Sequence, residues 1–553
     1  MQYEKYPAYR KYTKRRTIMK PMLICLILVF MIASLGAQEQ SWNWLSTSQI
    51  SSEAYANAVT IDASGDTYFA GHFKGNGSFG DHNLSSTQNY GDPSTDVIIG
   101  KVNSLGEFQW LRQSIGIYTE RATDIAIDSQ NNVYVTGTFG AQTSFGSTSL
   151  VAISTDSFLA KLDSAGNWLW AKQIGGSGIQ NANALCLDDE GNIYLTGEFS
   201  TGITIEDQSL GNLGAYDIFT AKLDANGELI WLQSTGSSAN DYAQDITLSV
   251  SGSLLVCGYF YGDPSFGSIT LERVGNCDLF VAEHDSLGNW QWVINAGSAN
   301  KNQFAYRLTT DPTGNIYVAG SYTGSPTFGS TTLAVDQNRD AYVAKISPTG
   351  SWLWAKAMGG SNQDDAYAIT IDSEGYLYVS GRYMGNMLIE DEWIYGGSED
   401  LYLLKLNDQG VMQDLTHSSG SGTWTASVKA IACNNTSIIC AGHYKGSISL
   451  GNYPAAPNPA FPNSTNLLLA KFGTLSSELS APQEPLISMG ENQFSLSWQS
   501  VPQATYYIVE AASAPDGTFN DVSSSGSFDG NSWTCSEPGQ SRMFFRIKAV
   551  GER

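Results

Sequence analysis

The sequence is poor in charged residues, histidine and cysteine, and it has no long apolar run. Charged residues make up 15% of the 553 residues, too few for a chain kept disordered by its charge. The 56 glycines are too many for a helical protein. The apolar run Met22 to Leu35 has 14 residues, whereas a helix that crosses a bilayer needs about 20. These shortages predict a folded, non-helical chain without a stable membrane span.

Motifs that carry catalysis or nucleotide binding are also absent. The chain has no G-x-S-x-G elbow, no H-E-x-x-H zinc motif and no phosphate-binding loop. No two cysteines are separated by only two residues, which excludes a zinc ribbon and a redox CxxC. We therefore expect no cofactor, no metal and no catalytic residues.

The first 37 residues have the pattern of a secretory signal peptide. Seven bases and one acid lie in the first twenty residues, ahead of the apolar run, and the small pair Gly36-Ala37 follows it. This order predicts cleavage near Ala37 and export to the periplasm, the cell surface or the medium of a bacterium. A retained anchor is the less favoured alternative, and Met19 is an alternative translation start.

The mature chain is strongly acidic. Removal of seven bases and one acid takes the formal net charge from −24 to −30. Such a surface repels phosphate backbones and anionic lipid, so nucleic acid and acidic membranes are poor partners. The simpler explanation, that acidity keeps an exported protein soluble, is preferred. We expect a monomer.

Six cysteines remain after cleavage, and buried free thiols are their expected state. Cys186 occupies a position that the sister repeats fill with small side chains. Cys433 and Cys440 flank one expected hairpin, so a disulfide between them is the alternative in an oxidising compartment.

The chain repeats with a period of about 61 residues. For the prediction of the fold class, this repeat carries more weight than any local pattern. One landmark is a tryptophan, replaced by aspartate in the last copy: Trp44, Trp110, Trp170, Trp231, Trp292, Trp354 and Asp414. A glycine follows each landmark by 27 or 28 residues: Gly71, Gly137, Gly197, Gly258, Gly320, Gly381 and Gly442. Two landmarks that keep one offset through seven copies define a structural repeat.

Each copy contains four short runs typical of strands. In the third copy these are 168–173, 182–187, 193–199 and 218–223. The turns between them share an aspartate followed three residues later by glycine, as in Asp188-Asp-Glu-Gly-Asn192. The aspartate bonds forward to backbone amides and the glycine supplies a positive φ, which closes a hairpin. Calcium binding is the weaker alternative, because a single acid per turn is poor coordination.

Four antiparallel strands repeated radially predict a β-propeller. The segments Asp128 to Phe139, Phe145-Gly146, Asp156 to Asp163 and Asn167 to Lys172 resemble the SBBP-type β-propeller repeat of secreted bacterial proteins. The resemblance covers about 42–473 and departs from the pattern at Ile205-Glu206, Ile389-Glu390 and Leu450-Gly451, where Phe-Gly is expected. It implies a propeller and export, and no particular activity.

The two ends of the repeat have complementary strand deficits. Trp42 to Ser48 matches the run that elsewhere follows a fourth strand, and the fourth run at 466–472 lacks the strand that should follow it. We therefore expect an all-β, seven-bladed propeller over 42–473, in which Trp42 to Ser48 is the outer strand of the last blade. Closure of this kind leaves no open sheet edge.

The last eighty residues have a different composition. Residues 474–484 read as a linker. Five short runs between 494 and 550 predict a small β-sandwich over 485–553. The spacings Leu-x-Trp, Ala-x-Tyr-Tyr-x-Val and Phe-Phe-Arg-Ile-x-Ala resemble a bacterial fibronectin type III module, which implies a spacer more than a binding site.

One symmetric set of positions is a candidate binding face. The residue after each repeat glycine is polar, and strand direction places all of them toward the end with the long connections: His72, Thr138, Glu198, Tyr259, Ser321, Arg382 and His443. In a closed ring His72 and His443 are neighbours, and two imidazoles with Glu198 suit a metal or a proton. A solvated strand end without a common ligand is the preferred alternative.

Two functions fit these features. The first is an exported noncatalytic binding or scaffold protein that contacts a glycan or a protein through the loop face, whose amides, hydroxyls and aromatics suit either ligand. The second is a propeller hydrolase or lyase that acts on an extracellular polysaccharide with polar groups around the channel mouth.

Overall fold

The computed structural model describes residues 40–474, apart from 90, 335, 419–424 and 435–436, together with strand segments between 478 and 550. Every long regular element in these residues is a strand, and none is a helix. The described strands belong to two compact units, one of them Gln40–Thr474. The predicted signal peptide and most of the predicted linker lie outside the described residues.

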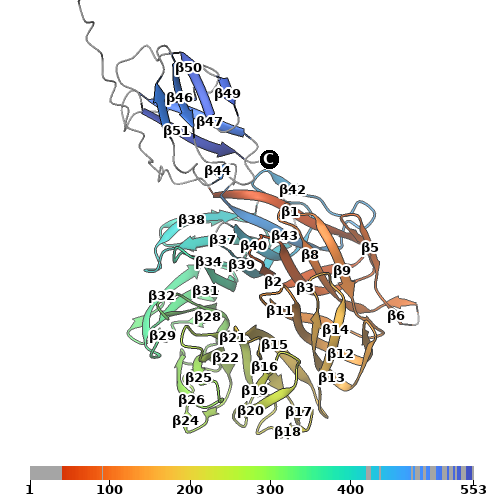
Figure 1. The fold of residues 1–553 in the computed structure, drawn as a ribbon. Helices are drawn as coiled ribbons and strands as arrows, with labels where there is room; N and C mark the ends of the chain where they lie inside the picture. The colour runs from red at the N-terminus through yellow and green to blue at the C-terminus, as the bar shows by residue number, and fades with distance from the viewer. Residues whose placement is uncertain are drawn as a thin grey trace, which may run out of the picture. The chain divides into compact units, whose positions relative to one another are not determined.

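Residues 40–474 fold into repeated sheets of four antiparallel strands (Figure 1). The first contains β2 (Glu53–Ile61), β3 (Thr67–Lys74), β8 (Thr95–Val102) and β9 (Phe108–Gln113). The second contains β11 (Arg121–Ile127), β12 (Val133–Phe145), β13 (Thr148–Leu162) and β14 (Trp168–Ile174). The third contains β15 (Gln180–Leu187), β16 (Ile193–Phe199), β19 (Asp217–Leu223) and β20 (Leu229–Thr235), so the runs predicted in the third copy form strands.

The next three sheets keep the same order. They contain β21 (Asp241–Leu248), β22 (Leu254–Phe260), β25 (Asp278–His284) and β26 (Trp290–Ala296). Then come β27 (Gln303–Thr310), β28 (Ile316–Gly324), β31 (Asp336–Ile346) and β32 (Trp352–Gly359). The last of the three contains β33 (Asp365–Ile371), β34 (Leu377–Tyr383), β37 (Asp400–Leu406) and β38 (Met412–His417).

The remaining set joins the two ends of this unit. β39 (Thr425–Cys433), β40 (Ser437–Lys445) and β43 (Thr465–Thr474) pair in that order, and β1 (Gln40–Ile50) pairs antiparallel with β43. Trp42 lies opposite Phe472 and Thr47 opposite Leu468. Ser48 Oγ accepts the Leu467 N–H at 2.9 Å. The outer strand here is therefore the N-terminal segment, the pairing that the strand deficits predict.

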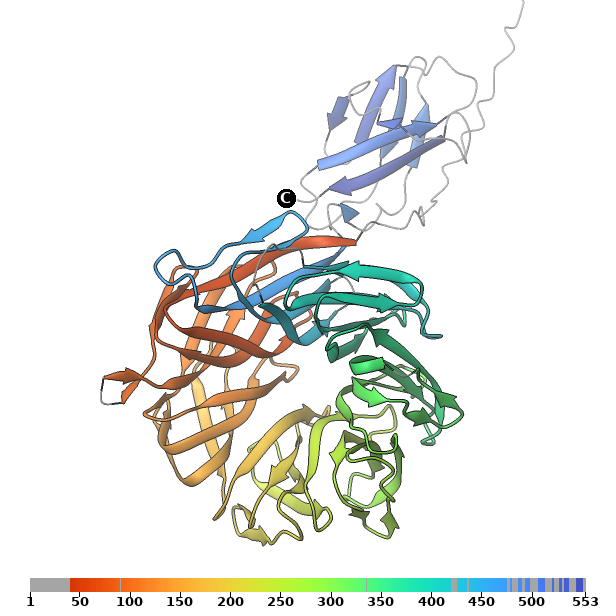
Figure 2. The same ribbon diagram turned by 180° about the vertical axis from the view of Figure 1, so that it is seen from behind.

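We call the first strand of each sheet its inner strand: β2, β11, β15, β21, β27, β33 and β39. Each inner strand contacts the next, and β39 contacts β2. Figures 1 and 2 show the sheets of this unit standing around a common centre. Residues of all seven inner strands line one cavity, which we call the central channel.

Short hairpins connect many second and third strands on the periphery. They are β4 (Asn76–Phe79) with β5 (His82–Ser85), β17 (Ile203–Ile205) with β18 (Gln208–Leu210), β23 (Ser265–Phe266) with β24 (Ile269–Thr270), β29 (Thr327–Phe328) with β30 (Thr331–Thr332), β35 (Asn386–Ile389) with β36 (Glu392–Tyr395) and β41 (Ile448–Leu450) with β42 (Tyr453–Ala455). Where the repeat has Phe-Gly the glycine is in the left-handed region, as at Gly146 (φ 61°). Glu206 (φ 51°) and Glu390 (φ 52°) adopt it in the two copies that lack this glycine.

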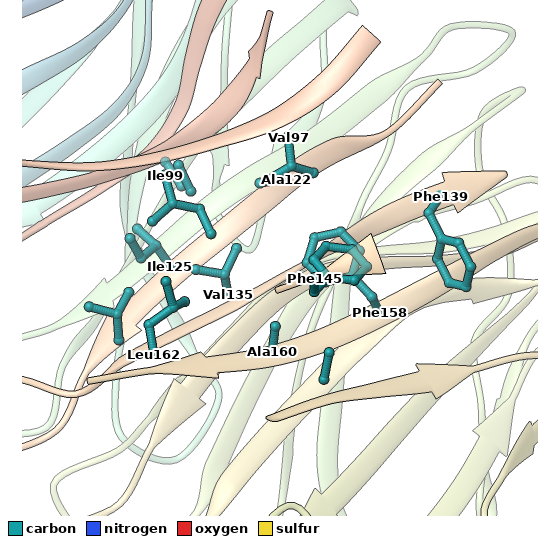
Figure 3. Close-up of a cluster of buried hydrophobic side chains, with 14 of the residues drawn as sticks. Val97, Ile99, Ala122, Ile125, Val135, Phe139, Phe145, Phe158, Ala160 and Leu162 are labelled. Atoms are coloured by element: carbon teal, nitrogen blue, oxygen red, sulfur yellow. The ribbon is translucent and has the colours of Figure 1, made fainter. Parts of the chain in front are cut away.

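The core lies between neighbouring sheets. Figure 3 shows Val97 and Ile99 of β8 facing Ile125 of β11 and Val135 of β12, and all four side chains are buried. At about 25 cal/mol per Å² of buried apolar surface, these faces supply most of the folding free energy. Each sheet is buried on both faces, so removal of one sheet would expose two others.

The aspartate–glycine turns form as predicted. Asp188 Oδ1 accepts the N–H groups of Glu190 at 3.0 Å and Asn192 at 2.8 Å, and Gly191 has a φ of +82°. The same bonds recur at Asp62, Asp163 and Asp311. Within the described residues no group of three or more His, Cys, Asp or Glu side chains could hold a metal ion. The bonds from the backbone N–H groups to Oδ1 are those of turn-forming aspartates.

Four of the repeated tryptophans, Trp44, Trp110, Trp231 and Trp354, bond to a turn of the neighbouring sheet. Trp110 Nε1 donates to the Ser164 carbonyl oxygen at 3.2 Å, and equivalent bonds join Trp44 to Ser104 and Trp354 to Asp408. A Cβ at Gly166 would lie 2.8 Å from the Trp110 ring, so glycine is required there. Asp414 faces a sheet whose outer strand β1 does not follow β43 through such a turn, which explains the missing tryptophan.

Cysteines described in this unit are free thiols: Cys186, Cys257, Cys277, Cys433 and Cys440. Cys433 lies opposite Ile438 and Cys440 opposite Ile431, so the two are not cross-strand neighbours. Cys433 Sγ instead donates to the Ile371 carbonyl oxygen at 2.9 Å. The disulfide alternative is wrong.

The second unit contains two sheets. One joins β44 (Glu478–Leu479), β51 (Phe544–Val550), β47 (Tyr506–Ala512) and β48 (Asn520–Asp521). The other joins β45 (Leu486–Met489), β46 (Gln493–Ser497), β50 (Ser532–Ser536) and β49 (Ser527–Asp529). Leu496, Val509 and Trp533 are buried.

Candidate functional site

The predicted binding-face positions lie on the second strands, each opposite an inner-strand residue. His72 pairs with Tyr55, Glu198 with Asn181 and Arg382 with Asp365. His72, Glu198 and Ser321 are buried, and the others are partly buried: Thr138, Tyr259, Arg382 and His443. Full solvation therefore does not describe His72, Glu198 and Ser321, while the other four positions keep partial access to solvent.

His72 and His443 meet through Tyr55. The ring centroid of Tyr55 lies 4.6 Å from that of His72 and 4.6 Å from that of His443. Burial lowers the pKa of both histidines to about 3. Both imidazoles are therefore neutral at pH 7. Because the Tyr55 ring lies between them, each imidazole packs against this ring and not against the other imidazole.

Glu198 is held by two amides and not by the histidines. Its Oε1 accepts from Asn181 Nδ2 at 2.8 Å and its Oε2 from Asn183 Nδ2 at 2.6 Å. Burial raises its pKa to about 7, against the lowering effect of these two bonds. The carboxyl group is therefore poised between its charged and neutral forms near neutral pH.

Arg382 belongs to a charged cluster on the β33 side of the channel. The buried Asp365 Oδ2 accepts from Arg339 Nη2 at 2.8 Å, Arg382 Nε at 2.9 Å and the Tyr367 hydroxyl at 2.9 Å. Arg382 Nη1 also contacts Glu399 Oε1 at 3.2 Å. The cluster fixes the Tyr367 ring at the channel wall.

The channel itself is lined by a set of residues that the repeat glycines do not mark. Every inner strand has a β-bulge immediately after its small residue, and the extra residue points into the channel. We call these residues the bulge ring: Asn57, Thr123, Asn183, Gln244, Tyr306, Tyr367 and Lys429. Together with Arg307 they line a cavity of about 300 Å³. That is the lower end of the usual range for small-molecule sites.

Three bulge-ring residues join their strand to the next one. Asn57 Nδ2 donates to the Ala122 carbonyl oxygen at 2.8 Å, Thr123 Oγ1 to that of Ala182 at 2.7 Å, and Asn183 Nδ2 to that of Ala243 at 2.7 Å. Each bond crosses from one inner strand to its neighbour. The asparagine amide groups thus serve the fold, and their Oδ1 atoms remain to accept a hydrogen bond from a ligand.

The opposite side of the ring has larger side chains that make no such bond. Tyr306 contacts the Ser321 hydroxyl at 2.9 Å, and its ring centroid lies 5.5 Å from that of Tyr367. Lys429 Nζ lies 3.7 Å from the centroid of the Tyr367 ring. Two aromatic faces and one ammonium group therefore form this wall.

A buried ionic group lies beside the cavity. Arg307 Nη1 contacts Asp245 Oδ1 at 3.3 Å, and Asp245 Oδ2 accepts the Leu308 N–H at 2.8 Å. Asp124 Oδ2 accepts the Leu185 N–H at 2.8 Å in the same way. Burial raises the pKa of Asp245 to about 6, and Arg307 opposes that rise. These groups connect neighbouring inner strands and leave Arg307 facing the cavity.

Sequence reasoning singled out the position after the repeat glycine, which stays a prediction, and missed the bulge position that lines the cavity. The signal was present, because the residue between Ala56 and Ala58, and between Ala182 and Ala184, is polar and recurs in every copy. In a regular strand that residue would share a face with Tyr55, and only the bulge, which has no periodicity of its own, directs it into the channel.

Comparisons with known proteins identify a broad class. No family model matches the sequence. An uncharacterised WD repeat-containing protein of Acanthamoeba polyphaga mimivirus is 23% identical over 365 residues, 52% of this chain and 26% of that protein. The regulatory protein FlaEY of Caulobacter vibrioides is 26% identical over 200 residues, 35% of this chain and 21% of that protein. The chain thus spans about a quarter or less of these relatives' lengths.

Solved structures give only distant likenesses. Puromycin hydrolase aligns with 81% of this chain and 59% of its own at a TM-score of 0.38 and 10% identity. A GH43 protein of Bacillus licheniformis aligns with 78% of this chain and 98% of its own at a TM-score of 0.25 and 10% identity. The radial four-stranded sheets and the WD-repeat relative define this chain as a β-propeller-like all-β protein. Among the described residues, no helix has the length and apolar character to cross a membrane.

Proposed function

We propose that the protein is an exported, noncatalytic binding protein that takes a glycan into the channel lined by the bulge ring. In this proposal residues 42–473 are a seven-bladed propeller of the SBBP-repeat type, closed by Trp42 to Ser48, and residues 485–553 are a fibronectin type III-like sandwich that acts as a spacer. The contact of β39 with β2 and the pairing of β1 with β43 support the closed ring.

The observation that carries the binding function is the composition of the cavity wall. It combines three amides, a hydroxyl, two phenols, one guanidinium group and one ammonium group around about 300 Å³. Amide oxygens accept hydrogen bonds from sugar hydroxyls, and tyrosine rings pack against the apolar faces of sugar rings. A protein segment is the other ligand that such a wall suits.

A hydrolase or lyase is the second candidate, and Glu198 is the reason to keep it. Its raised pKa of about 7 suits a general acid or base. However, both of its oxygens accept bonds from Asn181 and Asn183, and Asn183 also joins two inner strands. We assign Glu198 to the support of the channel wall.

A glycan array on the mature protein, with metal analysis and product analysis, tests this proposal. We expect metal-free binding without turnover, and at least tenfold weaker binding by Tyr306→Ala. Tyr118→Ala is the matched control, because Tyr118 is 53% exposed and does not line the cavity. Stoichiometric metal, or cleavage of a bound glycan, would favour the enzyme. Binding that Tyr306→Ala leaves unchanged would move the site elsewhere.

A further inference from the structure

Positive charge is in excess on the β33 and β39 side of the channel. Arg339, Arg382 and Lys429 lie there with two carboxylates, Asp365 and Glu399. The two arginines form ion pairs with those carboxylates, at 2.8 to 3.2 Å. One cation, Lys429, is left without a counter-charge in contact among the described residues. This surplus occurs in a chain whose net charge is −24.

Lys429 lines the cavity, and its ammonium group has no hydrogen-bond acceptor among the described residues. Its ammonium group lies 3.7 Å from the centroid of the Tyr367 ring. The ring face attracts the positive charge, but it offers no lone pair to the three N–H donors. His443, the nearest titratable ring on β40, is neutral because burial lowers its pKa to about 3. Arg339 Nε is a second buried donor without an acceptor in the described part of the chain.

The surroundings of this lysine disfavour its charged form. Desolvation lowers the pKa of Lys429 to about 8, and Arg382 and Arg339 add to the lowering, while Glu399 and Asp365 oppose it. No backbone carbonyl or carboxylate among the described residues is bonded to it, and its described contact is the Tyr367 ring at 3.7 Å. An ammonium group held at a cavity wall by a ring alone has its N–H donors directed to a ligand.

We propose that Lys429 is an anion-binding group, and that the glycan taken into the channel is acidic and carries a carboxylate on its sugar ring. The carboxylate lies against Lys429 in this arrangement, and the ring hydroxyls donate to the amide oxygens of Asn57 and Asn183 across the cavity. A sugar acid presents hydroxyl donors and a carboxylate acceptor on one small ring, which matches the acceptor side and the cationic side of the wall. This inference rests on the proposed function.

The test is calorimetric titration of the mature protein with an oligogalacturonate, its methyl ester and a neutral oligosaccharide of equal length. We expect the free acid to bind at least tenfold more tightly than its ester, and Lys429→Met to abolish that preference. Lys429→Arg retains it. Lys356→Met, on the outer strand β32 and outside the cavity, is the matched control and should bind as the parent does.

The pH dependence gives an independent check. Burial lowers the pKa of Lys429 to about 8, whereas the guanidinium in Lys429→Arg remains charged. Between pH 7 and pH 9 the affinity for the oligogalacturonate should therefore fall more steeply in the parent than in Lys429→Arg. Glu198, whose pKa is about 7, titrates in both proteins.

Three outcomes would overturn the inference, and they are distinguishable. Equal binding of acid, ester and neutral oligosaccharide would remove the anion site and leave the proposed glycan binding intact. Tight binding of the acid that Lys429→Met does not weaken would move the anion site elsewhere. Binding of polyglutamate with no binding of any glycan would overturn both this inference and the proposed function.

Discussion

The two halves of the bulge ring use one backbone position for different purposes. On β2, β11 and β15 the bulge residue is small and bonds to a carbonyl of the next inner strand at 2.7 to 2.8 Å. On β27, β33 and β39 it is a tyrosine or a lysine and makes no such bond. The repeat therefore fixes where the side chain points, while the residue type decides whether it stabilises the ring or faces a ligand.

This difference predicts where substitutions cost stability and where they cost binding. Replacement of a bonded amide should weaken the fold, because a buried carbonyl oxygen loses its donor. Replacement of Lys429 should change stability little, because the loss of its contact with the Tyr367 ring is offset by the removal of a desolvated cation.

Deletion of residues 38–49 should have the largest effect on stability, because both halves of the bulge ring depend on the pairing that joins the two ends of the repeat. It removes β1, exposes the edge of β43 and takes away Trp42 and Trp44, which are 5% and 8% exposed. We expect the melting temperature to fall by more than about 10 °C relative to the chain that starts at residue 38, as the loss of several kcal/mol requires in a domain of this size. A melting temperature that hardly moves would show that β1 does not close the ring.

Asn183→Leu should have the next largest effect. It removes the bonds to Ala243 and to Glu198, at 2.7 and 2.6 Å, and leaves a buried carboxylate with one donor fewer. We expect the free energy of unfolding in urea at pH 8 to fall by about 2–3 kcal/mol.

Lys429→Met is the matched variant from the other half, and we expect no loss of stability from it in the same titration. Equal destabilisation by the two substitutions would contradict the division of the ring into two halves.

His443→Phe should have a smaller effect that depends on pH. The pKa of His443 is about 3 in the folded protein and about 6.5 when unfolded, so the unfolded chain binds the extra proton between these values. The stability that this residue contributes is complete above pH 6.5 and is lost as pH falls toward 3.

The parent should therefore lose stability relative to His443→Phe by at most about 1.4 kcal/mol per pH unit below pH 6.5. Urea titrations of both proteins from pH 4 to pH 8 measure this. A constant difference across that range would show that His443 titrates normally.

Much of the fold follows from the sequence because the repeat averages out local ambiguity. The strands of the third copy, the aspartate turns and the pairing of Trp42 with Phe472 all agree with the structure. The sequence shows that Asp414 replaces the repeated tryptophan. It does not show the reason, which is that β1, the strand beside β43, does not follow it through a turn.

The site was predictable only in part. Position in the repeat correctly brings His72 and His443 together, but it does not reveal that Tyr55 lies between them at 4.6 Å from each ring. The bulge that directs Asn183 and Lys429 into the channel depends on how the inner strands crowd around the centre. Packing of this kind leaves no pattern in a single strand.

The most direct test of the account is the NMR signal of Lys429 after reductive ¹³C-methylation, assigned by its loss in Lys429→Met. We predict that this signal titrates near pH 8, ahead of the surface lysines, and shifts when the oligogalacturonate is added but not when its methyl ester is added. A Lys429 signal that stays fixed while the oligogalacturonate binds and other lysine signals move would contradict the assignment of the channel as the ligand site.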